Sequence, residues 1–120
     1  MVDFTKLNIW IRAKNLSVEI YRLTDDYPKI EQFGISNQMR RAATSVPANI
    51  SEGCSRDSKK DFSYFLSISI GSLNEIYTFL EIFSDLKYLQ LSKKNTLIKE
   101  INELKSMIYS YKKKLKTKES

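Results

Sequence analysis

The segment between Gly34 and Gly53 constrains the fold more than any other part of this sequence. Most of its side chains are small, which lets neighbouring backbones approach closely, and helical patterning continues on both sides of Pro47. Proline has no N–H and leaves the carbonyl of Ala43, four residues earlier, without its helical partner. We therefore predict a helix over about residues 36–52 that bends at Pro47 without ending there.

Local capping signals set the expected ends of this helix. Ser36 or Asn37 is a suitable N-cap, since short polar side chains accept hydrogen bonds from the first free N–H groups of a helix. Gly53 is expected to end the helix in the left-handed conformation that glycine adopts without a steric penalty. Thr44 or Ser45 is expected to satisfy part of the backbone that the proline leaves unpaired.

Three further helices follow from sustained apolar periodicity and from sparse punctuation, because the chain has only three glycines and two prolines. They cover about residues 4–26, 58–86 and 92–116. Their apolar seams recur mainly at intervals of three and four residues: Ile9, Ala13, Leu16, Ile20, Leu23 and Tyr27; Phe62, Leu66, Leu73, Ile76, Leu80 and Phe83; Leu97, Ile101, Leu104, Ile108, Tyr111 and Leu115. Four helices with short connections predict an all-α, antiparallel up-down-up-down four-helix bundle formed by a single domain, residues 1–120.

The ends of these three helices carry signals of their own. Asp3 or Thr5 can cap the first helix, and Pro28 ends it because the residue before a proline avoids the α region. Ser58 followed by Asp61 resembles a capping box at the start of the third helix. These signals place the connections outside the apolar seams.

The third helix is apolar on more than one face, so a single neighbouring helix cannot cover it. Partner helices can cover part of this surface, and a subunit interface can cover the rest. Ser67, Gly71 and Ser72 form a small-residue patch that permits close helix approach. Because glycine inside a helix costs about 1 kcal/mol relative to alanine, Gly71 is expected to serve packing.

The residue inventory argues against catalysis, and we expect no enzyme activity, no metal and no cofactor. The chain has no histidine, which removes the usual general base and metal ligand near neutral pH. Cys54 is the single cysteine, so neither a thiolate metal site nor a disulfide can form within one chain. No apolar stretch reaches the ~20 residues that span a bilayer. A single cysteine without a secretory signal predicts a cytoplasmic location.

Many residues match one known family, and the strongest block is the run from Gln38 to Gly53. The matching positions are Trp10, Ala13, Leu16, Ile20, Tyr21, Thr24, Tyr27, Pro28, Phe33, Gly34, Gln38, Met39, Arg40, Arg41, Ala42, Ala43, Ser45, Val46, Pro47, Asn49, Ile50, Glu52, Gly53, Phe62, Phe65, Leu66, Gly71, Ser72, Leu73, Glu75, Tyr88 and Leu89. On these residues the chain resembles the four-helix-bundle proteins encoded within intervening sequences of bacterial 23S ribosomal RNA genes. The resemblance covers about residues 4–111.

This resemblance implies an all-helical bundle that assembles as a homopentamer with a central channel. A similar bundle is the accessory variability determinant of diversity-generating retroelements, a basic pentamer that binds nucleic acid and a reverse transcriptase. The present chain is less basic than that relative outside its C-terminal tail, residues 112–120. RNA or DNA is therefore one expected partner, beside further copies of the chain itself.

Positive charges supply the candidate contacts with nucleic acid, in a chain of formal net charge +6. They are Arg40, Arg41, Lys112, Lys113, Lys114, Lys116 and Lys118. Structural interpretations stand beside this one: the two arginines can form ion pairs, with Glu52 or Glu75 as partners, and the lysines can complement the dipole of a solvated helix end. The alternative function is a homo-oligomeric adaptor that presents several copies of one surface to a protein partner.

Overall fold

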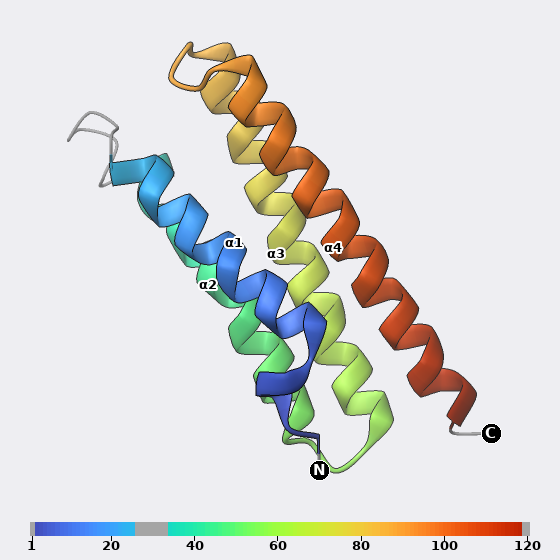
Figure 1. The fold of residues 1–120 in the computed structure, drawn as a ribbon. Helices are drawn as coiled ribbons and strands as arrows, with labels where there is room; N and C mark the ends of the chain where they lie inside the picture. The colour runs from blue at the N-terminus through green and yellow to red at the C-terminus, as the bar shows by residue number, and fades with distance from the viewer. Residues whose placement is uncertain (1, 26–33, 119–120) are drawn as a thin grey trace.

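The computed structural model describes residues 2–25 and 34–118, the last of these by its backbone alone. These residues form a short 3₁₀ helix, η1 (Phe4–Lys6), and four α-helices: α1 (Asn8–Asp25), α2 (Ile35–Cys54), α3 (Lys59–Asp85) and α4 (Leu91–Lys118). Figure 1 shows each helix returning along its predecessor, in a molecule that measures 49 × 23 × 20 Å. The predicted all-α four-helix fold is confirmed. The predicted stop at Pro28 lies outside the described residues.

The core lies along the predicted apolar seams. All six seam residues of α3 are buried, and Leu73, Ile76 and Leu80 have no exposed surface. The α1 seam is buried over residues 9–20, and the α4 seam over residues 97–108. Because burying apolar surface contributes roughly 25 cal/mol per Å², these seams are the main source of stability.

The first α-helix begins later than the sequence pattern predicts. Asp3 caps η1, and its carboxylate accepts hydrogen bonds from the Thr5 N–H at 3.1 Å and from the Thr5 hydroxyl at 2.6 Å. Leu7 is then extended, with φ −78° and ψ 128°, so α1 starts only after it. Phe4 packs edge-on against Trp10, with ring centroids 5.2 Å apart. The break therefore folds the start of the chain against α1.

Helix α2 continues without interruption through Pro47, which confirms that the proline does not end the helix; a bend there stays a prediction. The carbonyl that Pro47 leaves without a helical donor is that of Ala43. It accepts a hydrogen bond at 2.7 Å from the hydroxyl of Ser17, a buried residue of α1. The local donors expected from the sequence, Thr44 and Ser45, bond elsewhere. The proline is thus accommodated by a neighbouring helix.

A second set of polar contacts joins α2 to α3 beside the proline. The Ser69 hydroxyl donates to the Val46 carbonyl at 2.9 Å, and the Ser72 hydroxyl donates to the Ser45 hydroxyl, also at 2.9 Å. The Asn49 amide adds a hydrogen bond to the Ser45 carbonyl at 2.8 Å. Ser69 and Ser72 are buried, so small polar side chains fill the space between two closely spaced helices.

Gly53 serves packing rather than helix termination, which corrects the prediction of a left-handed end. It lies within α2, it is buried, and no glycine in the described residues has a positive φ. A β-carbon at this position would lie 2.7 Å from Cδ1 of Phe62 and 3.1 Å from Cβ of Phe65. Helix α3 can approach α2 here only because residue 53 has no side chain.

The helix caps agree with the sequence at α3 and differ at α2. Ser58 caps α3 as predicted, since its hydroxyl accepts a hydrogen bond from the Asp61 N–H at 3.0 Å. At α2 the N-cap is Gly34, which makes no side-chain cap bond. Ser36 is buried instead, and its hydroxyl has no hydrogen-bond partner among the described residues. The prediction of a Ser36 or Asn37 cap is therefore wrong, because Ile35 already belongs to the helix.

The turn between α3 and α4 uses a lysine where glycine is usual. Lys87 has φ 65°, in the left-handed region. The N–H of Tyr88 donates to the carbonyl of Phe83 at 2.9 Å, which closes a Schellman motif at the end of α3. The rings of Phe83 and Tyr88 lie 6.0 Å apart, the apolar contact that accompanies such a motif.

Helices α1 and α4 meet through a polar contact that we call the Arg12 clasp, formed by Arg12, Glu100 and Glu103. The guanidinium donates to both oxygens of Glu100, at 2.8 and 2.7 Å, and to Glu103 at 2.8 Å. The bonds to Glu100 and Glu103, Glu100 foremost, raise the pKa of Arg12. In return the hydrogen bond from Arg12 lowers the pKa of Glu103 below its ordinary value of 4.5. The clasp therefore favours the charged forms of Arg12 and Glu103.

Ser17→Ala is expected to destabilise the fold by about 1–3 kcal/mol, because it leaves the buried Ala43 carbonyl without a donor. Pro47→Ala restores an N–H to that carbonyl, so the serine substitution is expected to cost less in the Pro47→Ala background. Urea unfolding of the four members of this double-mutant cycle measures the coupling. An equal cost of Ser17→Ala in both backgrounds would show that the serine does not act through the carbonyl.

The Arg12 clasp is expected to lose its stabilising effect in acid. Because folding lowers the pKa of Glu103, its contribution is present above the ordinary value of 4.5 and is lost as the pH falls through the folded value. The stability difference between the wild type and Glu103→Gln should therefore be present at neutral pH and vanish in strong acid. Thermal melts over this range measure it, and a difference independent of pH contradicts it. Asp57→Asn is the control, since Asp57 forms no ion pair among the described residues.

Candidate nucleic-acid interface

The antiparallel pairing of α3 and α4 brings the start of one helix beside the end of the other (Figure 1). Side chains from both helices line a depression of about 390 Å³, which we call the lysine cleft. Its lining residues are Lys59, Lys60 and Ser63 from α3, and Lys112, Lys113, Leu115 and Lys116 from α4. Five cationic side chains from two helices thus surround one cleft.

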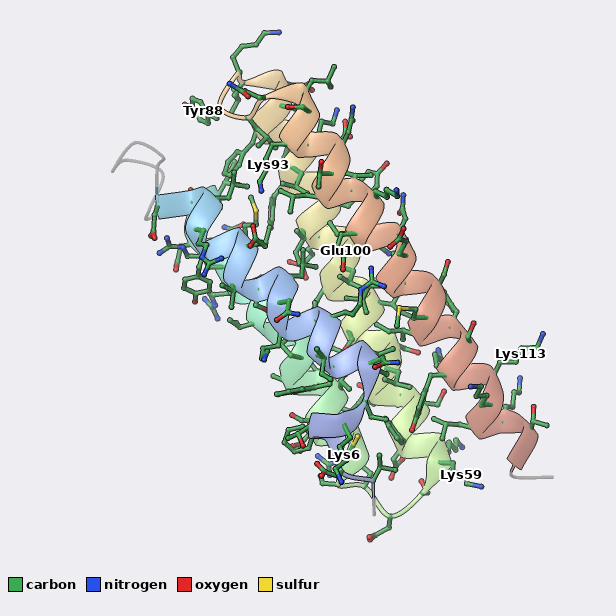
Figure 2. The ribbon with its side chains drawn as sticks, viewed as in Figure 1. Lys6, Lys59, Tyr88, Lys93, Glu100 and Lys113 are labelled. Atoms are coloured by element: carbon green, nitrogen blue, oxygen red, sulfur yellow. The ribbon has the colours of Figure 1, made fainter. Side chains whose placement is uncertain are left out.

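Among the described residues that line the lysine cleft, every charged side chain is a lysine. Lys60, Lys113 and Lys116 are exposed, and none of them forms an ion pair among the described residues. The Lys112 ammonium donates to the hydroxyl of Ser67 on α3. Figure 2 shows Lys59 and Lys113 on these two helices at the same end of the bundle. A cluster of this kind attracts anions.

Sequence reasoning missed two members of the lysine cleft, Lys59 and Lys60. A signal was present, because antiparallel alignment of the two seams places the start of the third helix opposite the end of the fourth. The expected basic tail is not separate from the fold: α4 continues to Lys118, whose side chain lies outside the described ones. Lys114 does not line the cleft and instead lines a groove on the α1 side of α4.

Arg40 forms hydrogen bonds and an ion pair with residues of the same chain, at the other end of the bundle from the lysine cleft. Its Nε donates to the Thr24 hydroxyl at 2.6 Å, and its Nη2 donates to the Asp25 carboxylate at 2.6 Å and the Tyr21 carbonyl at 3.2 Å. The guanidinium also lies 4.7 Å from the centroid of the Tyr21 ring. These contacts tie α2 to the end of α1 and favour the ion-pair interpretation, with Asp25 in place of the expected glutamates.

Arg41 is exposed on α2 and forms no ion pair among the described residues. It lines a shallow depression of about 350 Å³ to which Glu75 also contributes. Glu52, the other glutamate expected to pair with the arginines, pairs with Arg56 instead. The structure does not bring Arg41 to the lysine cleft, so its contact with nucleic acid stays a prediction.

Two further titratable side chains, Cys54 and Tyr111, belong to the core or pack against it. Burial raises the pKa of the Cys54 thiol, which keeps it protonated near neutral pH. Burial also raises the pKa of Tyr111, whose ring lies 5.4 Å from that of Phe62.

Within the described ranges, no group of three or more His, Cys, Asp or Glu side chains could hold a metal ion. Among the described helices, none combines the length and hydropathy needed to cross a membrane.

The fold and the lysine cleft define a class of protein: a small antiparallel helical bundle with a strongly basic end. The family model of the 23S rRNA-intervening sequence proteins matches residues 5–110, and this chain belongs to that family. The resemblance predicted from the sequence is therefore confirmed.

A solved structure has the same fold. It is the crystal structure, at 1.70 Å resolution, of a protein with unknown function from the S23 ribosomal protein family of Bacteroides thetaiotaomicron VPI-5482. The similarity has a TM-score of 0.78 and covers 88% of this chain and 98% of that chain. With 24% sequence identity, the likeness shows the fold alone. No curated protein matches the chain.

Proposed function

We propose that this chain is a non-enzymatic, self-associating protein that binds RNA or DNA through the lysine cleft. The observation that carries the proposal is the meeting of five lysines from two helices around one cleft whose described lining residues include no acidic side chain. Phosphate oxygens are suitable ligands for such a cleft, because each lysine that neutralises a phosphate releases condensed counterions.

The lysine cleft suits phosphate contacts rather than base recognition. Ammonium groups on flexible stems act as point charges, and contacts with phosphates carry no sequence information. Binding is therefore expected to depend strongly on salt and weakly on sequence. The buried, protonated thiol of Cys54 supports a non-enzymatic role, and a lone free cysteine suits the reducing cytoplasm that we propose as its location.

The outer face of α3 supports self-association. Tyr64, Ile68 and Gly71 follow one another at intervals of four and three residues, so they share one helix face. Tyr64 is 63% exposed, and a β-carbon on Gly71 would meet no atom within 4 Å. Ser67 and Ser72 form hydrogen bonds within the chain. Gly71, by contrast, packs closely against no part of the same chain, although the sequence predicts a packing role for it. A second copy of the chain against this face would supply the close packing partner that Gly71 lacks. The assembly that we propose is the homopentamer implied by the family resemblance.

An exposed apolar patch at the turn between α3 and α4 favours a second candidate function, that of an adaptor for a protein partner. Leu86, Tyr88 and Leu91 are 48%, 38% and 64% exposed. Figure 2 shows Tyr88 at the opposite end of the bundle from Lys59. Exposed apolar groups that gather on one surface mark protein interfaces. A homopentamer would present five such patches and bind through avidity.

Replacing Lys60 and Lys116 together by Gln is expected to weaken RNA binding for all sequences alike and to flatten its salt dependence. Each lost phosphate contact lowers the slope of log K against log salt by roughly 0.7–0.9. Fluorescence anisotropy of a labelled single-stranded RNA, titrated between about 50 and 200 mM salt, measures both effects. The matched control replaces Lys14 and Lys99, which lie outside the cleft, by Gln and therefore removes the same number of positive charges.

These point substitutions leave helix α4 intact, whereas removing residues from 112 onward would also remove Leu115, which packs against the core. Equal binding by the two double variants would exclude the lysine cleft as the binding site. If the intact chain binds no RNA or DNA at about 50 mM salt, where phosphate contacts are strong, the adaptor function is favoured. Native mass spectrometry with and without RNA reports the number of subunits and the bound polymer together.

Gly71→Trp is expected to break the assembly into single chains, because the indole would occupy the space that a second copy needs. Gly71→Ala should instead keep the fold and stabilise the isolated helix by up to about 1 kcal/mol, since alanine is the better helix former. Native mass spectrometry of both variants measures the assembly, with Thr96→Trp on the exposed face of α4 as the control. A monomeric wild type, or an unchanged assembly in Gly71→Trp, would contradict self-association through this face.

A further inference from the structure

A second hollow opens on the other side of α4, between its C-terminal half and the start of the chain. We call it the α1–α4 groove; its volume is about 490 Å³, within the range of small-molecule pockets. Its apolar lining consists of Leu7, Ile9, Met107 and Tyr111, of which Ile9 is buried and the others are half-buried. A ligand in this groove would therefore contact apolar side chains that are partly exposed to solvent.

The groove lies next to the Arg12 clasp, because Met107 lines the groove and also contacts Arg12. Beyond the clasp, η1 and the extended Leu7 lead the chain away from the axis of α1. The Arg12 Nη1 lies 3.3 Å from the sulfur of Met107, and the ring of Tyr111 packs against that of Phe62. Two of the apolar lining residues are thus held in place before any ligand arrives.

The polar lining of the groove consists of two lysines and the neutral side chains of Asn8 and two serines. Lys6 comes from η1 and Lys114 from α4, both are exposed, and none of the described residues that line the groove is acidic. Neither lysine forms an ion pair among the described residues. Ser106 and Ser110 add hydroxyl groups to the α4 side. The lining therefore combines an apolar surface with two ammonium groups and small hydrogen-bond donors.

We propose that the α1–α4 groove binds a medium-length alkyl carboxylate, with the alkyl chain against Leu7, Ile9 and Met107 and the carboxylate held by Lys6 and Lys114. A neutral apolar molecule would leave both ammonium groups without a counter-charge. A nucleic acid would satisfy the lysines but leave the apolar lining in contact with phosphate and sugar. The binding of this ligand is independent of the lysine cleft, which lies on the α3 side of α4.

Calorimetric titration of the intact chain with hexanoate, octanoate and decanoate tests the proposal. Affinity is expected to rise roughly two- to fourfold for each added methylene, because each buried CH₂ is transferred out of water. Octanoate is expected to bind with a dissociation constant on the order of 1 mM or below. Octanol, which has the same chain without the charge, is expected to bind more weakly. Backbone amide shifts in NMR spectra should change at Ser106, Met107 and Ser110.

Replacing Lys6 and Lys114 together by Gln should weaken octanoate binding about three- to tenfold, the combined effect of two exposed charge contacts. The Lys60 and Lys116 double variant is the matched control and should bind octanoate as the wild type does. Circular dichroism confirms that both variants fold. Equal binding of octanol, unchanged affinity in the Lys6 and Lys114 variant, shifts confined to other helices, or no binding at millimolar octanoate would each overturn the proposal. None of these results depends on whether the chain binds RNA.

Discussion

The hydrogen bond from Ser17 to the Ala43 carbonyl is the contact on which the arrangement of the helices depends. A proline inside α2 creates a carbonyl that the helix itself cannot satisfy, and a buried unsatisfied carbonyl is costly. The donor comes from α1, so this hydrogen bond forms only in the register that places Ser17 opposite Ala43. The bond from Ser69 to the Val46 carbonyl places α3 against the same turn of α2. Three helices are thus positioned around one proline.

Close packing on one side of the bundle contrasts with polar contact on the other. Between α2 and α3 the buried serines and Gly53 let the backbones approach closely, and the depression that Arg41 and Glu75 line lies on the surface beside this contact. Between α1 and α4 the Arg12 clasp holds the helices together while leaving apolar side chains half-covered beside it. Both hollows that carry our proposals are lined by residues of α4.

The lysine-rich end of α4 serves two surfaces, because consecutive residues of a helix point about 100° apart. Lys113 and Lys116 line the lysine cleft with α3, whereas Lys114 lines the α1–α4 groove. Leu115 packs toward the core between them. A run that reads in the sequence as one basic tail is thus divided by helical geometry into two sites with different chemistry. The lysine cleft is lined mainly by cations, and the α1–α4 groove combines cations with a larger set of apolar side chains.

The sequence by itself determined the four helices, their seams and the cap at Ser58, because apolar periodicity and capping are local properties of the chain. It also identified Pro47 as an interior residue of a helix. Only the tertiary structure decided which residue donates a hydrogen bond to the Ala43 carbonyl, since Ser17 lies 26 positions away. The same holds for Gly53, whose role depends on its distance from Phe62, and for Lys59 and Lys60, which join the lysine cleft from another helix. Contacts between helices depend on their register, and the register is settled only when all the seams pack at once.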